Sequence, residues 1–168
     1  MMKNERPIVI LKLSTLDKAL DLTSLSIILF TWIYTILQVA KLPQTIPTHF
    51  DFNGKIDDYG NKATLFILPS IITLVYIGMT ILNRYPHRFN YMQKITVENA
   101  EKQYATATRL MRIIKLIIAV FALIITFDIL QSATIKNGDF HWWFLPLTVV
   151  SLFLPILISL TVLKPKKK

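Results

Sequence analysis

The sequence predicts an all-α integral membrane protein with four transmembrane helices, a small external β-hairpin and a cytoplasmic helical extension of the third span. Two compositional observations support this: 53% of the 168 residues are apolar, and only 17% are charged, whereas soluble domains are about a quarter charged. The third observation is that four stretches approach or reach the roughly 20 apolar residues that cross a bilayer. A mean hydropathy of +0.48 argues against both a soluble enzyme and disorder. The absence of cysteine excludes disulfides and thiolate sites.

The predicted spans are residues 22–40, 63–82, 111–130 and 142–163, which make residues 1–168 one membrane domain. The third span carries Lys115 near one end and Asp128 near the other. Nothing interrupts a helix between Val97 and about Ser132, so this helix is expected to project beyond the bilayer, with Thr96 as its N-cap. The first span is predicted to be a retained anchor, because it is longer than the apolar region of a signal peptide and lacks a cleavage site.

Lys and Arg residues predict the orientation of the spans. Fifteen of the 19 lie in the N-terminal segment, the loop 83–110, the start of the third span and the C-terminal tail. Four, Lys41, Lys55, Lys62 and Lys136, lie on the other side. The positive-inside rule places both termini in the cytoplasm. The net charge of +9 is therefore interpreted as a topology signal, with lipid rather than nucleic acid as the surroundings.

The external loop 41–62 contains the signals of a β-hairpin. Pro43 and Pro47 favour extended backbone, and Asn53-Gly54 is typical of a two-residue turn. The expected cross-strand pairs are Phe52 with Lys55, Asp51 with Ile56, Phe50 with Asp57, and His49 with Asp58.

Alternation places His49, Asp51 and Asp58 on one face of the predicted ribbon. An imidazole and two carboxylates are a set that can bind a divalent cation, and no other cofactor is expected. The alternative, which we favour at this point, is that these side chains are solvated or brace the turn.

The cytoplasmic loop 83–110 is rich in proline and aromatic residues. It is interpreted either as an interface-hugging connector or as a platform for a cytosolic partner, in which Asn90, Tyr91 and Glu98 would make the contact.

Two motifs, LPxxIPTHFDFNGKIDDYGNK and NRYPxxFNYxxxIT.EN, resemble the membrane domain family of unknown function numbered 1648. That domain also forms the N-terminal part of the immunity protein against a sporulation-delaying toxin. The resemblance covers roughly residues 35–104, over a third of the chain. It stresses Asp57, whereas the hairpin register points His49 toward Asp58. The C-terminal half of the longer immunity protein has no counterpart here.

The resemblance implies a bacterial cytoplasmic-membrane protein that acts by binding and is not an enzyme. Its role would be toxin-peptide immunity or envelope-stress sensing, and its partners a toxic peptide, another membrane protein or a cytosolic repressor. A small transporter or export accessory subunit, and a membrane-embedded metal-dependent hydrolase, are the alternatives.

Asp128 and Gln38 are expected at one depth near the external interface, where they would line a polar cleft beneath the hairpin. The complete set of candidate binding residues has three parts. They are His49, Phe50, Asp51, Asn53, Gly54, Asp57 and Lys62 in the hairpin; Gln38 and Asp128 in the spans; and Asn83, Pro86, Asn90, Tyr91, Glu98, Asn99 and Tyr104 in the cytoplasmic loop.

Overall fold

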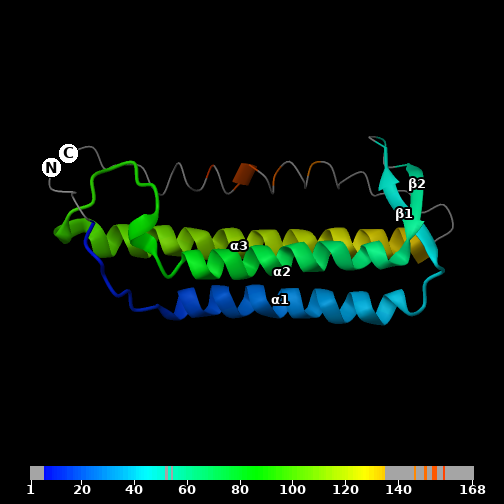
Figure 1. The fold of residues 1–168 in the computed structure, drawn as a ribbon, viewed down its shortest axis with the longest axis horizontal. Coiled ribbons are helices and arrows are strands. Elements are labelled where there is room, and N and C mark those ends of the chain that lie inside the picture. Colours follow the sequence, from blue (N-terminus) through cyan, green and yellow to red (C-terminus); the bar gives the residue numbers. More distant parts are fainter. Residues whose placement is uncertain are drawn as a thin grey trace.

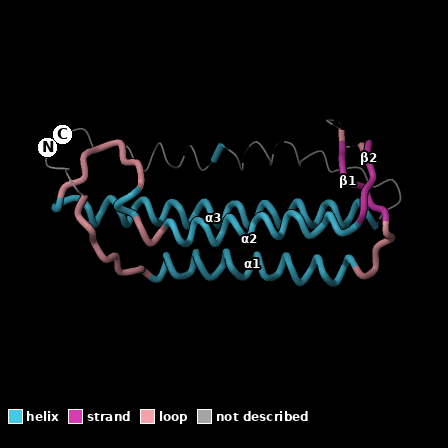
Figure 2. The backbone as a smooth tube through the Cα atoms, in the orientation of Figure 1, coloured by secondary structure: helices cyan, strands magenta, loops and turns pink. Residues whose placement is uncertain are grey.

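The computed structural model describes residues 6–51, 53 and 55–134, together with five isolated positions between 146 and 157. Its elements are, in chain order, α1 (Thr15–Val39), β1 (Thr45–Phe50), β2 (Ile56–Asn61), η1 (Lys62–Phe66), α2 (Ile67–Leu82), η2 (Pro86–Arg88) and α3 (Val97–Thr134). Helices α1 and α3 run in the same direction and α2 runs in the opposite direction, and each of the three helices packs against the other two (Figure 1). The two strands lie at one end of the bundle, here called the hairpin end (Figure 2). Residues 6–13 and the loop 83–96 lie at the other, the loop end.

Three helices in the described part of the chain are long and apolar enough to cross a membrane: Thr15–Val39, Lys62–Leu82 and Val97–Thr134. They match the first three predicted spans and indicate a membrane protein. The fourth predicted span, 142–163, lies outside the described residues apart from the five isolated positions.

Local chemistry explains where the helices begin. Helix α1 starts before the predicted residue 22 because Ser14 and Asp17 form a capping box: the Asp17 amide donates to Ser14 Oγ at 3.2 Å, and the Ser14 amide donates to Asp17 Oδ2 at 2.9 Å. Helix α2 starts later than predicted because residues 62–66 form a 3₁₀ turn. Pro69 therefore lies in the first turn of α2, where its missing N–H is not needed. Helix α3 is continuous from Val97, as predicted.

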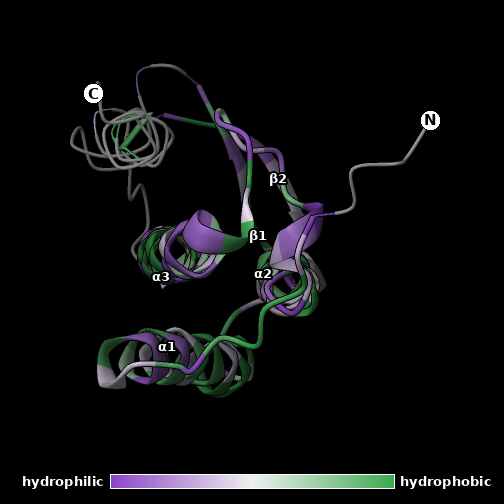
Figure 3. Ribbon diagram, turned by 90° about the vertical axis from the view of Figure 1, so that its left-hand side faces the viewer, coloured by the Kyte–Doolittle hydropathy of each residue, from purple (hydrophilic) through white to green (hydrophobic). Residues whose placement is uncertain are grey.

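The bundle has polar and small side chains inside and large apolar ones outside. Ser24, Thr31 and Thr35 of α1 are buried, and their hydroxyls donate to the carbonyl one turn earlier at 2.7, 2.9 and 2.8 Å. Helix α1 packs most extensively on α3, whose buried Ala119 and Ala122 allow close approach. Seen from the end, the three helices are predominantly hydrophobic (Figure 3). Their exposed apolar side chains suit contact with lipid, as expected for spans in a bilayer.

Candidate functional site

The hairpin has an irregular register. His49 lies opposite Asp58, as predicted, but Phe50 lies opposite Ile56 rather than Asp57, with an irregularity on each side of His49. Asp57 is therefore an additional residue in β2 relative to β1, which is the arrangement of a β-bulge. The predicted pairing of Phe50 with Asp57 is wrong for this reason.

The turn also differs from the prediction. The Asp51 amide donates to the Lys55 carbonyl at 2.8 Å, so the hydrogen-bonded pair that closes the turn is separated by three residues in the sequence rather than by the predicted two. The Asp51 carboxylate Oδ1 accepts from the amides of Asn53 and Lys55, each at 2.8 Å, and so braces the loop. Phe52 and Gly54 lie outside the described residues.

The amide of Lys55, and then that of Asn53, hold the pKa of the Asp51 carboxyl below its ordinary value. Because the folded-state pKa is lowered, these bonds support the loop while Asp51 is ionised and are lost as the pH falls through that pKa.

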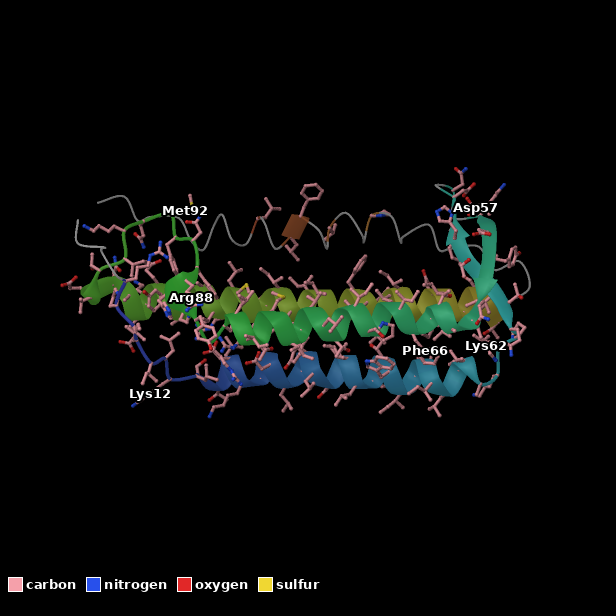
Figure 4. The ribbon with its side chains drawn as sticks, in the orientation of Figure 1. Lys12, Asp57, Lys62, Phe66, Arg88 and Met92 are labelled. Carbon is pink, nitrogen blue, oxygen red and sulfur yellow. The ribbon has the colours of Figure 1, made fainter. Side chains whose placement is uncertain are left out.

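The hairpin places His49 against Asp57. His49 Nδ1 lies 2.6 Å from Asp57 Oδ1, and the two side chains are 68% and 45% exposed. Asp57 is the acidic residue that the family resemblance stressed, and the bulge brings it to His49. Because the pair is exposed, it contributes about 0–1 kcal/mol to stability. Its position at the outer part of the hairpin makes it available for contact with another molecule (Figure 4).

The three candidate metal ligands have separate partners. Asp51 braces the loop, Asp58 Oδ1 accepts from the Tyr59 amide at 2.8 Å, and His49 contacts Asp57. In the described ranges, no group of three or more histidine and acidic side chains is placed to hold a metal ion.

The base of the hairpin is fixed to the helix ends. Ile46 is 1% exposed and lies in an apolar cluster with Leu42, Leu65 and Leu130. Lys62 Nζ donates to the carbonyls of Val39 and Leu42 at 3.1 and 2.9 Å. A lysine there satisfies carbonyls at the C-terminal end of α1 and complements the helix dipole. Lys62 is thus an anchor for the hairpin (Figure 4).

Gly60 is required by close packing between the strands. A Cβ atom at this position would lie 2.8 Å from Thr48 Cγ2. We expect Gly60→Val to destabilise the hairpin by about 1–3 kcal/mol, because the strands must separate to admit the side chain. Limited proteolysis of the hairpin in detergent micelles measures this. Gly78→Ala is the matched control, since a Cβ there meets nothing within 4 Å. Equal protease resistance in both variants would contradict the prediction.

At the loop end, residues 6–13 form an extended segment, here called the N-terminal strap. Arg6 Nη1 donates to the carbonyls of His87, at 3.2 Å, and Phe89. The Arg6 guanidinium also lies 5.5 Å from the centre of the Tyr91 ring. Tyr104 donates to the Pro7 carbonyl at 3.0 Å. The strap therefore ties the loop 83–96 to the start of α3 (Figure 1).

Most of the predicted partner-docking residues hold this loop together. Tyr104 is fully buried, and the Tyr91 hydroxyl donates to the Pro86 carbonyl at 2.9 Å. Burial raises the pKa of Tyr91 well above its usual range. Asn99 accepts from the Thr96 amide at 2.9 Å and so caps α3. Asn83 Nδ2 donates to the Thr108 carbonyl at 3.3 Å.

Two of the predicted docking residues differ from the rest. Asn90 and Glu98 are exposed and remain candidates for contact with a partner.

A buried charge cluster, which the sequence reasoning missed, joins the three helices near the loop end. Arg109 Nε donates to Asp17 Oδ1 at 2.9 Å. Asp21 accepts from Arg112 Nε at 2.9 Å and from Lys115 Nζ at 2.6 Å. The Arg112 and Lys115 side chains are only 6% and 1% exposed.

Helix α2 completes this cluster. Lys115 Nζ also donates to Thr80 Oγ1 at 3.0 Å and lies 4.5 Å from the centre of the Tyr76 ring. The positive side chains had been counted as a topology signal. The sequence does contain a signal for this cluster, which is the spacing of its charges. Asp17 and Asp21 are one turn apart on α1, and they lie at the same depth as the basic residues Arg109, Arg112 and Lys115 of α3.

Asp128 and Gln38 do not line the cavity that the structure has at the hairpin end. Asp128 is 1% exposed and Gln38 is half-buried. That cavity, of about 450 Å³, has mainly apolar walls from the hairpin, α2 and α3, which include Pro47, Leu65 and Ile129. Within the described part of the chain, the two polar residues are not among its lining, so the predicted polar cleft is not the observed cavity.

Residues 26–73 match the family described as "Domain of unknown function (DUF1648)". The matched region contains the second half of α1, the hairpin and the first turns of α2. An "Uncharacterized protein" of Archaeoglobus fulgidus is 35% identical over 86 residues, which cover 46% of this chain and 47% of the relative. The chain thus matches about half the length of that relative. No solved structure matches.

Proposed function

We propose that the protein binds a membrane-active toxic peptide through the hairpin, at the outer face of a bacterial cytoplasmic membrane, and so protects the cell. The observation that carries the proposal is the hairpin itself: a braced projection whose His49, Asp57 and Tyr59 side chains are exposed. Its base is held by the apolar cluster and by Lys62, so these side chains are presented with little loss of freedom on binding.

The charge distribution supports this orientation. Of the 13 Lys and Arg residues that the structure describes, ten lie toward the loop end, and the positive-inside rule assigns that end to the cytoplasm. Envelope-stress sensing would use the same hairpin and pass the event to a cytosolic repressor at the loop end, where Asn90 and Glu98 are exposed.

The test expresses the protein in a bacterium that is sensitive to the sporulation-delaying toxin and measures survival when the purified toxin is added. Wild type should protect, and His49→Ala and Asp57→Ala should each lower protection at least tenfold while the protein stays inserted. The expected loss corresponds to about 1.4 kcal/mol of binding free energy per tenfold change.

Asp58→Asn is the matched control, because an amide oxygen can still accept from the Tyr59 amide. It should protect like wild type. Failure of the wild-type protein to protect, or full protection by both alanine variants with intact hairpins, would refute the proposal.

A further inference from the structure

A second cavity, of about 460 Å³, lies at the loop end between the N-terminal strap and the three helices. The strap contributes residues from Ile8 to Leu13, and the end of α2 contributes Thr80 and Asn83. Helix α3 contributes Arg112 and Lys115. Both cations belong to the buried charge cluster, so the cavity lies directly beside that cluster.

The walls of the cavity carry more positive than negative charge. Arg84, Arg112 and Lys115 line it, and Asp21 is the only carboxylate among the lining residues that the structure describes. Both oxygens of Asp21 are already used, one by Arg112 and one by Lys115. One carboxylate therefore neutralises two almost fully buried cations. A buried cation without a full counter-charge is unfavourable, so the cavity attracts an anion.

Two residues that line the cavity, Arg112 and Asn83, each carry a buried polar atom with unused hydrogen-bonding capacity. Arg112 is 5% exposed, and its Nη1 has no hydrogen-bond partner. Asn83 Oδ1, from the neighbouring helix end, also has none. The first atom is a charged donor and the second is an acceptor. A phosphate group that carries a hydroxyl-bearing substituent would satisfy both.

The rim of the cavity is apolar on the side of the strap. Ile8 and Ile10 lie beside this basic cavity, and they are 78% and 93% exposed. Exposed isoleucines are unfavourable in water but suit the boundary between lipid headgroups and acyl chains. The cavity thus combines a site for a phosphate with a surface for the chains attached to it.

From these observations we infer that the loop-end cavity binds the phosphate of an anionic glycerophospholipid, with Arg112 donating to the phosphate, the positive charge of Lys115 attracting it, and Asn83 accepting from a headgroup hydroxyl. Free phosphate shares the recognised group and is the competing source. The inference does not depend on the hairpin, so His49→Ala should leave lipid binding unchanged, whatever its effect on toxin protection.

The experiment uses the full chain in an uncharged detergent and measures the thermal midpoint with added phosphatidylglycerol, phosphatidylcholine or inorganic phosphate. Phosphatidylglycerol should raise the midpoint by several degrees, because a ligand of the folded state stabilises it. Phosphatidylcholine should have little effect. An equal rise with inorganic phosphate would support the anion site but overturn the assignment to lipid. The inference would be overturned if both lipids raised the midpoint equally, or if none of the three additives raised it. The cavity would then hold only water.

Arg112→Gln should weaken phosphatidylglycerol binding by at least about tenfold, since it removes a charged donor. Arg88→Gln is the control: Arg88 is an exposed cation at the same end that stacks on Tyr85 and is not among the cavity's lining residues. Unchanged lipid binding by a folded Arg112→Gln protein would overturn the inference.

Thr80→Asp is a second test of lipid binding at the cavity, for the case in which Arg112→Gln does not fold. It gives Lys115 a second carboxylate in place of the hydroxyl that now accepts from Nζ. The apo protein should remain folded while the response to phosphatidylglycerol is lost, because the excess positive charge is then neutralised within the protein. Thr80→Ser, which keeps the hydroxyl, should respond like wild type. A full lipid response in Thr80→Asp would overturn the inference.

Discussion

Asp21→Asn should destabilise the protein by about 3–5 kcal/mol, which is the usual effect of removing one partner from a buried ion pair. Asp21 is the carboxylate that accepts from both Arg112 and Lys115, whose side chains are 6% and 1% exposed. The asparagine leaves these two buried cations without the carboxylate that both now contact. The shift in thermal unfolding in micelles measures the effect.

Lys18→Gln is the control, because Lys18 is an exposed residue on the same helix. A second comparison replaces Asp21, Arg112 and Lys115 together by leucine and methionines. This variant should recover most of the lost stability, since an apolar cluster of similar size avoids the desolvation of charges. A single Asp21→Asn variant as stable as wild type would show that the charge cluster does not hold the helices together.

Tyr104→Ala should cost about 3–5 kcal/mol, the range for truncating a buried aromatic side chain. Tyr104 is fully buried in a cluster with Ile95 and Ala100, against which Val9 and Leu11 of the strap pack. Its ring also lies 5.6 Å from that of Tyr91. The truncation removes the support of both the strap and the loop 83–96, so trypsin should cleave after Lys12 much faster than in wild type.

Tyr104→Phe separates packing from hydrogen bonding. It loses only the bond to the Pro7 carbonyl, which is worth about 1 kcal/mol. Met92→Ala is the exposed control in the same loop (Figure 4). If cleavage after Lys12 is equally slow in Tyr104→Ala and wild type, contacts other than those of Tyr104 hold the strap.

The hairpin shows where prediction from sequence reached its limit. The two prolines and Asn53-Gly54 predicted two strands and a reversal, and these local signals were sufficient to find the hairpin. The register depends on a bulge, which the alternation of residues does not encode. Because of it, the His49 side chain pairs with Asp57 although Asp58 lies opposite His49 in the register, and Asp51 uses its carboxylate to brace the loop.

In the membrane spans, too, some features followed from the sequence and others only from the tertiary structure. The sequence alone determined three of the helices through their runs of apolar residues. It also determined the unbroken course of α3, because no helix-breaking residue interrupts that segment. Both properties depend on residues that are neighbours in the chain. The charge cluster and the strap were decided only by tertiary structure. Asp17 and Arg109 are 92 residues apart and Pro7 and Tyr104 are 97 apart. No local pattern specifies such pairs. They form because α1 and α3 run parallel and in contact, so that a carboxylate on one helix can neutralise a cation on the other away from water.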